Sequence, residues 1–286
     1  MFQRAGNGKR YCLYCLGWIL ILTLVCGGAQ SATLYEQSRQ KLESRLAGIQ
    51  KEPYTFVVMG DNRDNEKVFI KCLLTAARYH PLFILHTGDV VSNGSKEQFL
   101  HFLSLLQQTL PDMPVFVAAG NHDMTNRDKS DISSDKGKAL FQQLIGPLDY
   151  VLDLPGINAR FILLNNSEHS LTSNQIDYMK AELSVENSLK FVLMHVPPQT
   201  LKWNDKTFTK GADAFLQALS GRNVAGVFYG HCHIYDEDTI SGTRHIITGG
   251  AGAPLNHLPF GDASYHFVVV TLSGGKVSTE KVLVSE

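Results

Sequence analysis

The sequence predicts a single α/β domain with a largely parallel β-sheet, and two observations predict this fold class. The chain of 286 residues is 44% hydrophobic and 19% charged, with 24 Gly and only 10 Pro. This composition can form a sizeable core and excludes collagen-like, low-complexity and wholly disordered chains. From Pro53 onward, short β-rich runs alternate with helical patterns, which implies right-handed crossovers between parallel strands. We find no internal repeat and no linker, so residues 53–286 are expected to form one domain.

The expected elements follow one another in a regular order. Leucines among charged residues in 32–52 predict a surface helix that spaces the domain from the N-terminal segment. Strands are expected at 55–59, 82–85 and 115–117, with helices near 66–79 and 95–109 and a third helix that ends at Gly146-Pro147. Further strands are expected at 161–164, 191–194 and 224–228, with helices near 173–184 and 211–219. The last segments, 244–248, 265–271 and 276–283, are strand-like, with a hairpin turn at 273–275.

Residues 1–31 have the order of a secretory signal: basic, then apolar, then small. The basic residues are Arg4, Lys9 and Arg10, and the apolar stretch is Tyr11–Cys26. Cleavage after Ser31 suits a signal peptide, whereas an uncleaved anchor is also open because the stretch reaches about the 17 to 20 residues that span a bilayer. We therefore expect export to the periplasm or the extracellular space, with membrane contact only through this segment if it is uncleaved.

The charge balance gives no electrostatic reason to expect nucleic acid as a partner. The chain has 26 Lys+Arg and 27 Asp+Glu. Three of the bases and none of the acids lie in 1–31, so the remainder carries 23 bases against 27 acids, a net charge of −4. A slightly acidic body does not attract a phosphate backbone.

Cysteine usage excludes a disulfide framework. Three of the five cysteines lie in the first 31 residues, and the body keeps only Cys72 and Cys232. Cys72 shares a helical face with Val68, Phe69 and Ala76, which favours a buried core thiol over a bond to Cys232.

Polar motifs follow five of the expected strands. They are Gly60-Asp61-Asn62-Arg63, Gly88-Asp89, Gly120-Asn121-His122-Asp123, Met194-His195 and Gly230-His231-Cys232-His233. Loops at the carboxyl ends of strands in an open α/β sheet converge on one crevice, so these segments can meet. Carboxylate and amide oxygens with neutral imidazoles suit two divalent ions such as Mn, Fe or Zn. The glycines are expected to let the chain turn sharply off each strand.

When each motif is taken alone, the motifs differ in how strongly they indicate a metal site. Gly-Asp after a strand is typical of a turn or helix cap, and a lone His195 is more typical of a protein core. Gly-Asn-His-Asp and Gly-His-x-His are rare, and their joint occurrence in this order predicts a metal site. The histidines without such neighbours are interpreted as structural: His80, His86, His101, His169, His245, His257 and His266.

Together these motifs resemble the calcineurin-like metallophosphoesterase superfamily. The resemblance extends from Thr55 to about Val282 and includes Gln175 and the glycine-rich segment 249–253. It implies a four-layer αββα sandwich of two mixed β-sheets flanked by helices. It also implies hydrolysis of a phosphoester by a hydroxide activated at two divalent metal ions.

The resemblance implies a role for each matching residue. Asp89 is expected to bridge both ions, with Asp61 and His233 completing the first site and Asn121, His195 and His231 completing the second. His122 is expected to stabilise the transition state or protonate the leaving oxygen, with Asp123 orienting its imidazole. No Ser, Cys or Asp has the sequence context of an activated nucleophile, which agrees with direct hydrolysis.

Arg63 departs from the family pattern, in which the first motif reads Asp-x-His and the histidine binds the first metal. A guanidinium cannot coordinate a metal. Three interpretations stay open: the first metal has fewer protein ligands, Arg63 clamps phosphate as a catalytic residue, or Arg63 pairs with Asp64 or another acid.

The substrate is left open by the sequence. The loops 124–138 and 197–210 could supply a phosphate clamp or, through Trp203, a base-stacking platform, or they could be solvated surface. A phosphoester small molecule or a lipid head group is expected, as a monoester, a diester or a pyrophosphate. The alternative is a non-catalytic metal-binding scaffold of the same fold, but such a scaffold is expected to lose His122 or the later histidines.

Overall fold

The computed structural model describes residues 32–48, 51–128, 131–186 and 188–286. Ala32–Glu286 form one compact unit. The predicted signal peptide or anchor, 1–31, lies outside the described residues. Among the residues that are described, no helix is both long enough and apolar enough to cross a bilayer.

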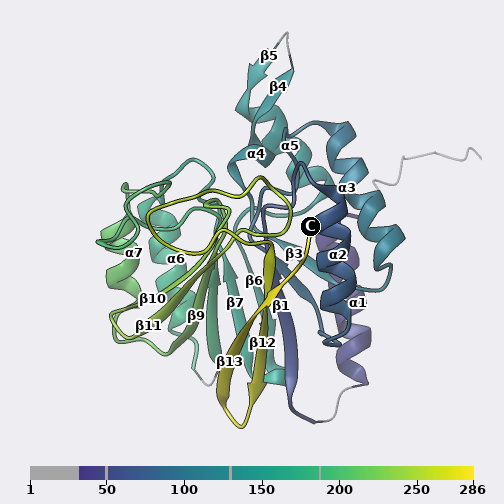
Figure 1. The fold of residues 1–286 in the computed structure, drawn as a ribbon. Helices are drawn as coiled ribbons and strands as arrows, with labels where there is room; N and C mark the ends of the chain where they lie inside the picture. Colours follow the sequence, from purple (N-terminus) through teal and green to yellow (C-terminus); the bar gives the residue numbers. More distant parts are fainter. Residues whose placement is uncertain (1–31, 49–50, 129–130, 187) are drawn as a thin grey trace, which may run out of the picture. The chain divides into compact units, whose positions relative to one another are not determined.

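The first sheet has five strands in the order β13-β12-β1-β2-β3 (Figure 1). Their bounds are β1 (Tyr54–Met59), β2 (Ile84–His86), β3 (Val115–Val117), β12 (His266–Ser273) and β13 (Lys276–Leu283). The three strands from the first half of the chain are parallel, whereas β12 is antiparallel to β1 and β13 is antiparallel to β12. This sheet is therefore mixed.

The second sheet has six strands in the order β10-β11-β9-β8-β7-β6. Their bounds are β6 (Tyr150–Leu154), β7 (Ala159–Leu163), β8 (Leu189–Leu193), β9 (Val224–Tyr229), β10 (Tyr235–Ile240) and β11 (Thr243–Thr248). The four inner strands are parallel, and both edge strands are antiparallel to their neighbours. A separate hairpin, β4 (Asn126–Asp128) and β5 (Asp131–Ser133), projects beyond the sheets (Figure 1).

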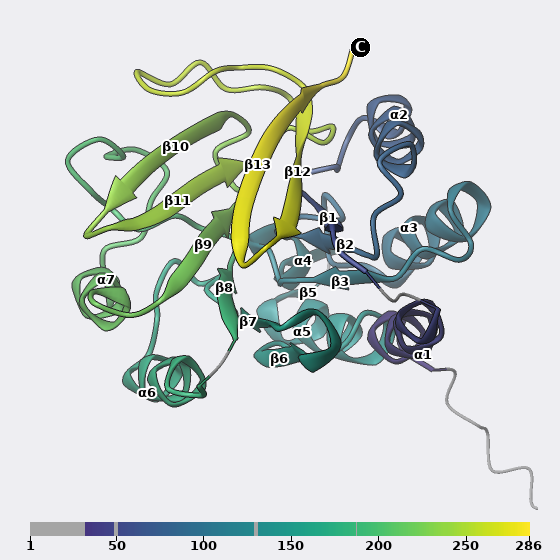
Figure 2. The same cartoon turned by 90° about the horizontal axis from the view of Figure 1, so that it is seen from below.

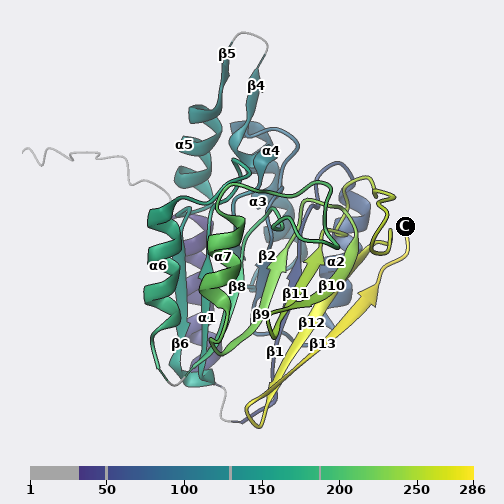
Figure 3. The same ribbon diagram turned by 90° about the vertical axis from the view of Figure 1, so that its left-hand side faces the viewer.

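Helices cover the outer face of each sheet, which gives four layers (Figures 2 and 3). The first sheet packs against α2 (Glu66–Ala77) and α3 (Lys96–Thr109), with α5 (Ser134–Leu144) packed on α3, and the second sheet packs against α6 (Ser173–Leu183) and α7 (Ala212–Leu219). Side chains along β1 alternate: Val57 and Met59 face the helices, while Phe56 and Val58 face the second sheet. The fold is thus the predicted four-layer αββα sandwich.

Aromatic rings fill the space between the two sheets. Phe56 of the first sheet stacks on Phe83 with ring centroids 5.3 Å apart. The Phe56 ring also packs edge-to-face against the rings of Phe161 and Phe191 from the second sheet. Such side chains bury large apolar areas and prefer these stacked and edge-to-face geometries. This inner core fixes the two sheets against each other and therefore fixes the loops at their strand ends.

The first helix, α1 (Leu34–Ala47), packs against the edge of the sandwich. A capping box at Thr33 starts it, and Gly48 follows its end. The Ser38 hydroxyl, buried at the helix face, accepts from Val115 N and donates to Val115 O, both at 2.9 Å. Tyr35 packs edge-on against Tyr150 of β6. The helix expected in 32–52 is thus present, and it supplies hydrogen-bond partners to the β3 edge at Val115.

Most expected elements are present within a few residues of their predicted bounds. Two edge strands, β6 and β10, were not predicted, and neither were the short helices α4 (Asn121–Met124) and η1 (Pro155–Ile157). Cys72 and Cys232 are both free and buried, which confirms the core-thiol interpretation of Cys72.

Candidate metal centre and active site

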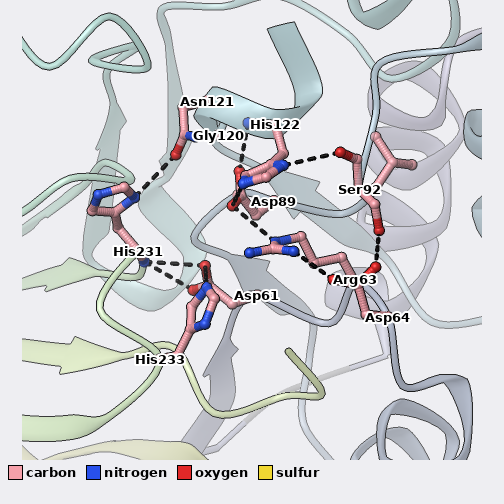
Figure 4. A network of polar contacts seen from close by, with 12 residues as sticks. Asp61, Arg63, Asp64, Asp89, Ser92, Gly120, Asn121, His122, His231 and His233 are labelled. Atoms are coloured by element: carbon pink, nitrogen blue, oxygen red, sulfur yellow. Dashed lines mark hydrogen bonds and ion pairs between the residues drawn. The ribbon is translucent and has the colours of Figure 1, made fainter. Parts of the chain in front are cut away.

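The polar motifs meet at the carboxyl ends of five strands (Figure 4). Asp61 follows β1, Asp89 follows β2, and Asn121 begins α4 just after β3. The histidines come from the second sheet: His195 follows β8, while His231 and His233 follow β9. The structure thus brings together all six residues that the sequence analysis assigned to metal, from segments up to 170 positions apart.

Asp61, Asp89 and His233, here called the first metal group, are buried with ligand atoms within 4.8 Å of one another. His233 Nδ1 lies 2.7 Å from the Pro254 carbonyl, which can only accept, so Nδ1 carries the proton. The Nε2 lone pair therefore faces Asp61 Oδ1 at 3.5 Å. Burial, together with the Asp89 carboxylate, raises the pKa of Asp61 well above its ordinary value. A cation between these acceptors would relieve the repulsion, so the donor set fits a metal ion.

Asp89, Asn121, His195 and His231, which the sequence analysis assigned to a second ion, are here called the second metal group. His195 Nδ1 donates to the Thr87 carbonyl at 2.8 Å, which leaves the Nε2 lone pair to point inward. That Nε2 lies 3.0 Å from Asn121 Oδ1, 3.2 Å from His231 Nδ1 and 3.4 Å from Asp89 Oδ1. Burial lowers the pKa of His195 to about 3 and that of His231 to about 2, so both imidazoles are neutral. Converging oxygens and neutral imidazoles fit a divalent ion.

Asp89 faces both groups. Its Oδ1 accepts from the His122 backbone N at 2.9 Å and lies near His195, while its Oδ2 lies 3.4 Å from Arg63 Nε. A carboxylate placed between two sets of acceptors is the arrangement that a bridging ligand requires.

Four of these six residues have left-handed backbones. The φ angles are +58° at Asp61, +56° at Asp89, +66° at His231 and +50° at His233. Non-glycine residues rarely adopt this conformation, which persists where the surrounding structure enforces it. Hydrogen bonds between the loops do so here: Asp61 N donates to Gly88 O at 3.0 Å, and His231 N donates to both Asp61 carboxylate oxygens.

The glycines before the ligands serve mainly for close approach of the loops. A Cβ on Gly120 would lie 2.2 Å from Asp89 N, so only glycine lets these two loops touch. Gly88 alone among the glycines preceding these ligands has a positive φ, at +101°. The expected sharp turn is therefore present at Gly88. At Gly120 the glycine is required for a different reason, the close approach of the Asp89 loop.

The predicted role of Asp123 is wrong in its hydrogen-bond partner. The Asp123 carboxylate accepts from the backbone N–H groups of Asp89, Val91 and Gly120 at 2.8–3.2 Å, so it ties two loops together. The His122 imidazole is oriented instead by the Ser92 carbonyl, which lies 2.9 Å from Nδ1. His122 Nε2 then faces Asp89 Oδ2 at 4.0 Å.

Arg63 reaches the metal groups and also forms an ion pair. Its Nη1 pairs with Asp64, whose other oxygen accepts from the Ser92 hydroxyl (Figure 4). Its Nε points at Asp89 Oδ2, and its side chain is 15% exposed. The guanidinium is thus paired with Asp64 and also lies beside Asp89, at the edge of the first metal group.

Sequence reasoning missed two residues near the second metal group. Asn166 Oδ1 accepts from the backbone N of His195 and of Val196 at 3.1 and 3.0 Å, which fixes the His195 loop. His169, interpreted as structural, packs its ring edge-on against His231 with centroids 4.8 Å apart. Both follow β7, so the rule that polar residues matter at strand ends could have found them.

Trp203 cannot stack on a ligand base, because the structure buries it completely. Its ring packs against Tyr229 at a centroid distance of 5.9 Å, and Nε1 donates to Asp236 at 2.8 Å. Lys202 pairs with the same aspartate at 2.9 Å. In the other predicted pocket loop, 124–138, residues 129–130 lie outside the described residues, and so do the side chains of 126–135.

Comparison with solved structures shows the same fold. GAP50, the anchor in the inner membrane complex of Plasmodium, matches with a TM-score of 0.63 and 17% identity, over 82% of this chain and 85% of that one. PhoD matches with a TM-score of 0.57 and 12% identity, over 79% of this chain and 65% of that one.

Comparison by sequence adds a relative and a family. The chain is 24% identical over 202 residues to the 3′,5′-cyclic adenosine monophosphate phosphodiesterase CpdA of Haemophilus influenzae, which covers 67% of each protein. The family model described as calcineurin-like phosphoesterase matches residues 54–235, a range that contains both metal groups. The chain therefore belongs to the calcineurin-like phosphoesterases, a family of metal-dependent phosphoester hydrolases.

Proposed function

We propose that this enzyme hydrolyses its phosphoester with two divalent ions, one in each metal group. The observation that carries the proposal is the convergence of acceptors: His195 Nε2, His231 Nδ1 and Asn121 Oδ1 lie within 3.2 Å of one another. When His231 carries its proton at Nε2, all three atoms are acceptors, and such acceptors are stable together around a cation. When bound, such ions lower the pKa of water and neutralise charge on the phosphoryl group.

Three residues around the metal groups are assigned separate roles: proton transfer, phosphoryl binding and positioning of the ligand loops. The Ser92 carbonyl accepts the Nδ1–H of His122, so a proton stands at Nε2 only in the doubly protonated imidazolium, and that is the form that would protonate the leaving oxygen. Arg63, fixed through Asp64, is placed to hydrogen-bond a phosphoryl oxygen beside Asp89. Asp123 keeps the Asp89 and Gly120 loops in contact and so preserves the ligand geometry.

A small phosphoester is the proposed substrate, and the protein is proposed to act outside the cytoplasm. The relative CpdA is named for cleaving a cyclic phosphodiester, which makes diesters part of any substrate test. The acidic body argues against a nucleic-acid substrate. A scaffold without turnover is the second candidate, but the retention of His122 beside a complete ligand set favours an enzyme.

The decisive experiment measures metal and activity together on the full chain. Metal-stripped protein is reloaded with Mn²⁺ and assayed against a monoester, an acyclic diester and a cyclic nucleotide. Asp89→Asn should lose both bound metal and activity, because one fewer anionic ligand faces both metal groups. A variant that keeps the wild-type metal stoichiometry would show that Asp89 is not a bridge. Metal binding without hydrolysis of any ester would favour the scaffold.

Export can be tested separately. Residues 1–40 are fused to a reporter that is active only outside the cytoplasm. Activity of the fusion is expected, and the size of the product distinguishes cleavage after Ser31 from an uncleaved anchor. A cytoplasmic pool alone would contradict export.

A further inference from the structure

A cavity of about 280 Å³ lies between α2 and α3, next to the residues that surround His122. Arg63 and Ser92 are part of its wall. Ser92 is also the residue whose carbonyl orients His122, and Arg63 is the residue that faces Asp89. The cavity therefore shares Arg63 and Ser92 with the surroundings of Asp89 and His122.

The lining of this cavity combines an apolar wall with one unsatisfied acceptor. Phe69 and Phe102 contribute the apolar wall, and Glu66 stands at the exposed rim, where its carboxylate lies 2.9 Å from His101 Nε2. Asn62 is only 7% exposed; its Nδ2 donates to Val90 O at 3.2 Å, but its Oδ1 accepts from no residue that the structure describes. A buried acceptor without a donor is costly, so a group that donates a hydrogen bond is favoured there.

We propose that this cavity is the leaving-group pocket, and that it takes a small alcohol carrying its own hydrogen-bond donor, a hydroxyl or an ammonium group. The proposal rests on the proposed hydrolysis and names the alcohol side of the ester. The donor meets Asn62 Oδ1 and the Glu66 carboxylate while Arg63 stays with the phosphoryl group. Pockets for drug-sized ligands occupy roughly 300–1,000 Å³, so this cavity fits an ethanolamine or glycerol fragment better than a whole nucleoside.

In the proposed hydrolysis, each bond that forms is matched by a bond that breaks, and each proton has a donor and an acceptor. The oxygen of water forms a bond to phosphorus, and the bond between phosphorus and the alcohol oxygen breaks. The alcohol oxygen takes the second proton of the His122 imidazolium, which is held at Nε2, and the proton that water loses restores the imidazolium. The free alcohol then leaves the cavity, and phosphate or a phosphomonoester leaves the metal groups.

The test uses three monoesters of similar size on the Mn²⁺-loaded full chain. Phosphoethanolamine and glycerol 3-phosphate carry a donor, whereas propyl phosphate has a methyl group in its place. We expect kcat/KM for both donor-bearing esters to exceed that for propyl phosphate by roughly tenfold. If kcat/KM is higher for phosphoethanolamine than for glycerol 3-phosphate, the pocket prefers an ammonium group; the reverse order indicates a hydroxyl group. Equal kcat/KM for all three would overturn the pocket assignment but not the hydrolysis, while no cleavage even of p-nitrophenyl phosphate would contradict the proposed function itself.

Two variants separate recognition from a structural role. Asn62→Ala and Glu66→Gln should each shrink the preference for donor-bearing esters over propyl phosphate. Glu97→Gln is the matched control: Glu97 is an exposed acid on α3, the other helix beside the cavity, but it does not line the cavity, so this variant should keep the wild-type preference. If both cavity variants lower kcat/KM equally for all three esters, these side chains only support the fold and the inference fails.

Discussion

At the scale of single residues, the direction of each imidazole decides what the site can bind. The carbonyls of Thr87 and Pro254 accept the Nδ1–H of His195 and His233, so both rings turn an Nε2 lone pair inward. Such a partner fixes the tautomer and the orientation of a metal-binding histidine. The direction of these lone pairs is therefore set by backbone carbonyls that no motif in the sequence reveals.

His122→Ala should lower kcat by about 10² to 10⁴, the usual range for a lost general acid, and leave the metal content intact. Metal should stay because the hydrogen bond to Asp89 Oδ1 comes from the His122 backbone N, which alanine keeps, whereas the ring bonds to the Ser92 carbonyl and lies 4.0 Å from Asp89 Oδ2. Rates on esters of good and poor leaving groups are compared. The loss should be smaller for acidic leaving groups, which need no proton, and an equal loss for both would assign His122 to positioning only.

Variants of Arg63 should change how tightly the first metal group binds its ion. The guanidinium lies 3.4 Å from Asp89 Oδ2 and competes electrostatically with a cation there. Arg63→Ala should therefore raise the weaker of two metal affinities in a calorimetric titration, and Arg63→His should raise it further by adding a ligand. If Arg63 also clamps phosphate, both variants lower kcat/KM by roughly 10- to 150-fold. Unchanged affinities with unchanged kcat/KM in both variants would leave only the Asp64 ion pair.

At the scale of elements, the sequence predicted what periodicity controls and missed what packing controls. The strands β1 and β8 are apolar runs, and α2 has a clear apolar face, so all three were found. The edge strand β10 reads Tyr-Asp-Glu-Asp-Thr-Ile and is only half-buried, so its composition resembles a loop. The helix α1 was recognised, but its apolar stripe gave no sign that a buried serine would pair with a strand edge.

Ser38→Ala should therefore destabilise the fold by about 2 kcal/mol. The change removes the hydroxyl that both accepts from Val115 N and donates to Val115 O, and it leaves two buried backbone groups without partners. Urea unfolding of the full chain measures the difference. Ser44→Ala is the control, because the Ser44 hydroxyl is exposed and bonds only to Gln40 O within its own helix. If the two variants are equally stable, α1 does not contribute through this contact.

At the scale of the whole molecule, the convergence of five strand ends could be predicted in part from topology. Parallel strands end at one edge of their sheet, so the ligands meet within each sheet. The aromatic core between the two sheets then brings the two edges together. The role of Asp123 could not be predicted in the same way. Its partners are backbone N–H groups brought close by the Gly120 contact with Asp89, and such contacts exist only after the loops have packed. Trp203 was misjudged for the same reason, since its burial depends on Tyr229 from a distant strand.

The stability of the whole fold should fall in mild acid, partly through His245. This ring is buried against Trp203, and Nδ1 bonds to the Tyr229 hydroxyl at 2.8 Å. Burial lowers its pKa to about 4, whereas the unfolded chain has a value near 6.5. Because the unfolded state binds the proton first, the contribution of His245 is complete above about pH 6.5 and is lost as the pH falls toward 4.

His245→Gln should therefore flatten the dependence of unfolding free energy on pH. Between pH 7 and 5 the wild type should lose on the order of 2 kcal/mol more than this variant, since glutamine cannot take up the proton. Urea unfolding at the two pH values gives the double difference, in which the contributions of all other titrating groups cancel. His257→Gln serves as the control, because His257 is exposed and its replacement should leave the pH dependence unchanged. The same slope in all three proteins would mean that acid destabilises the fold through groups other than His245.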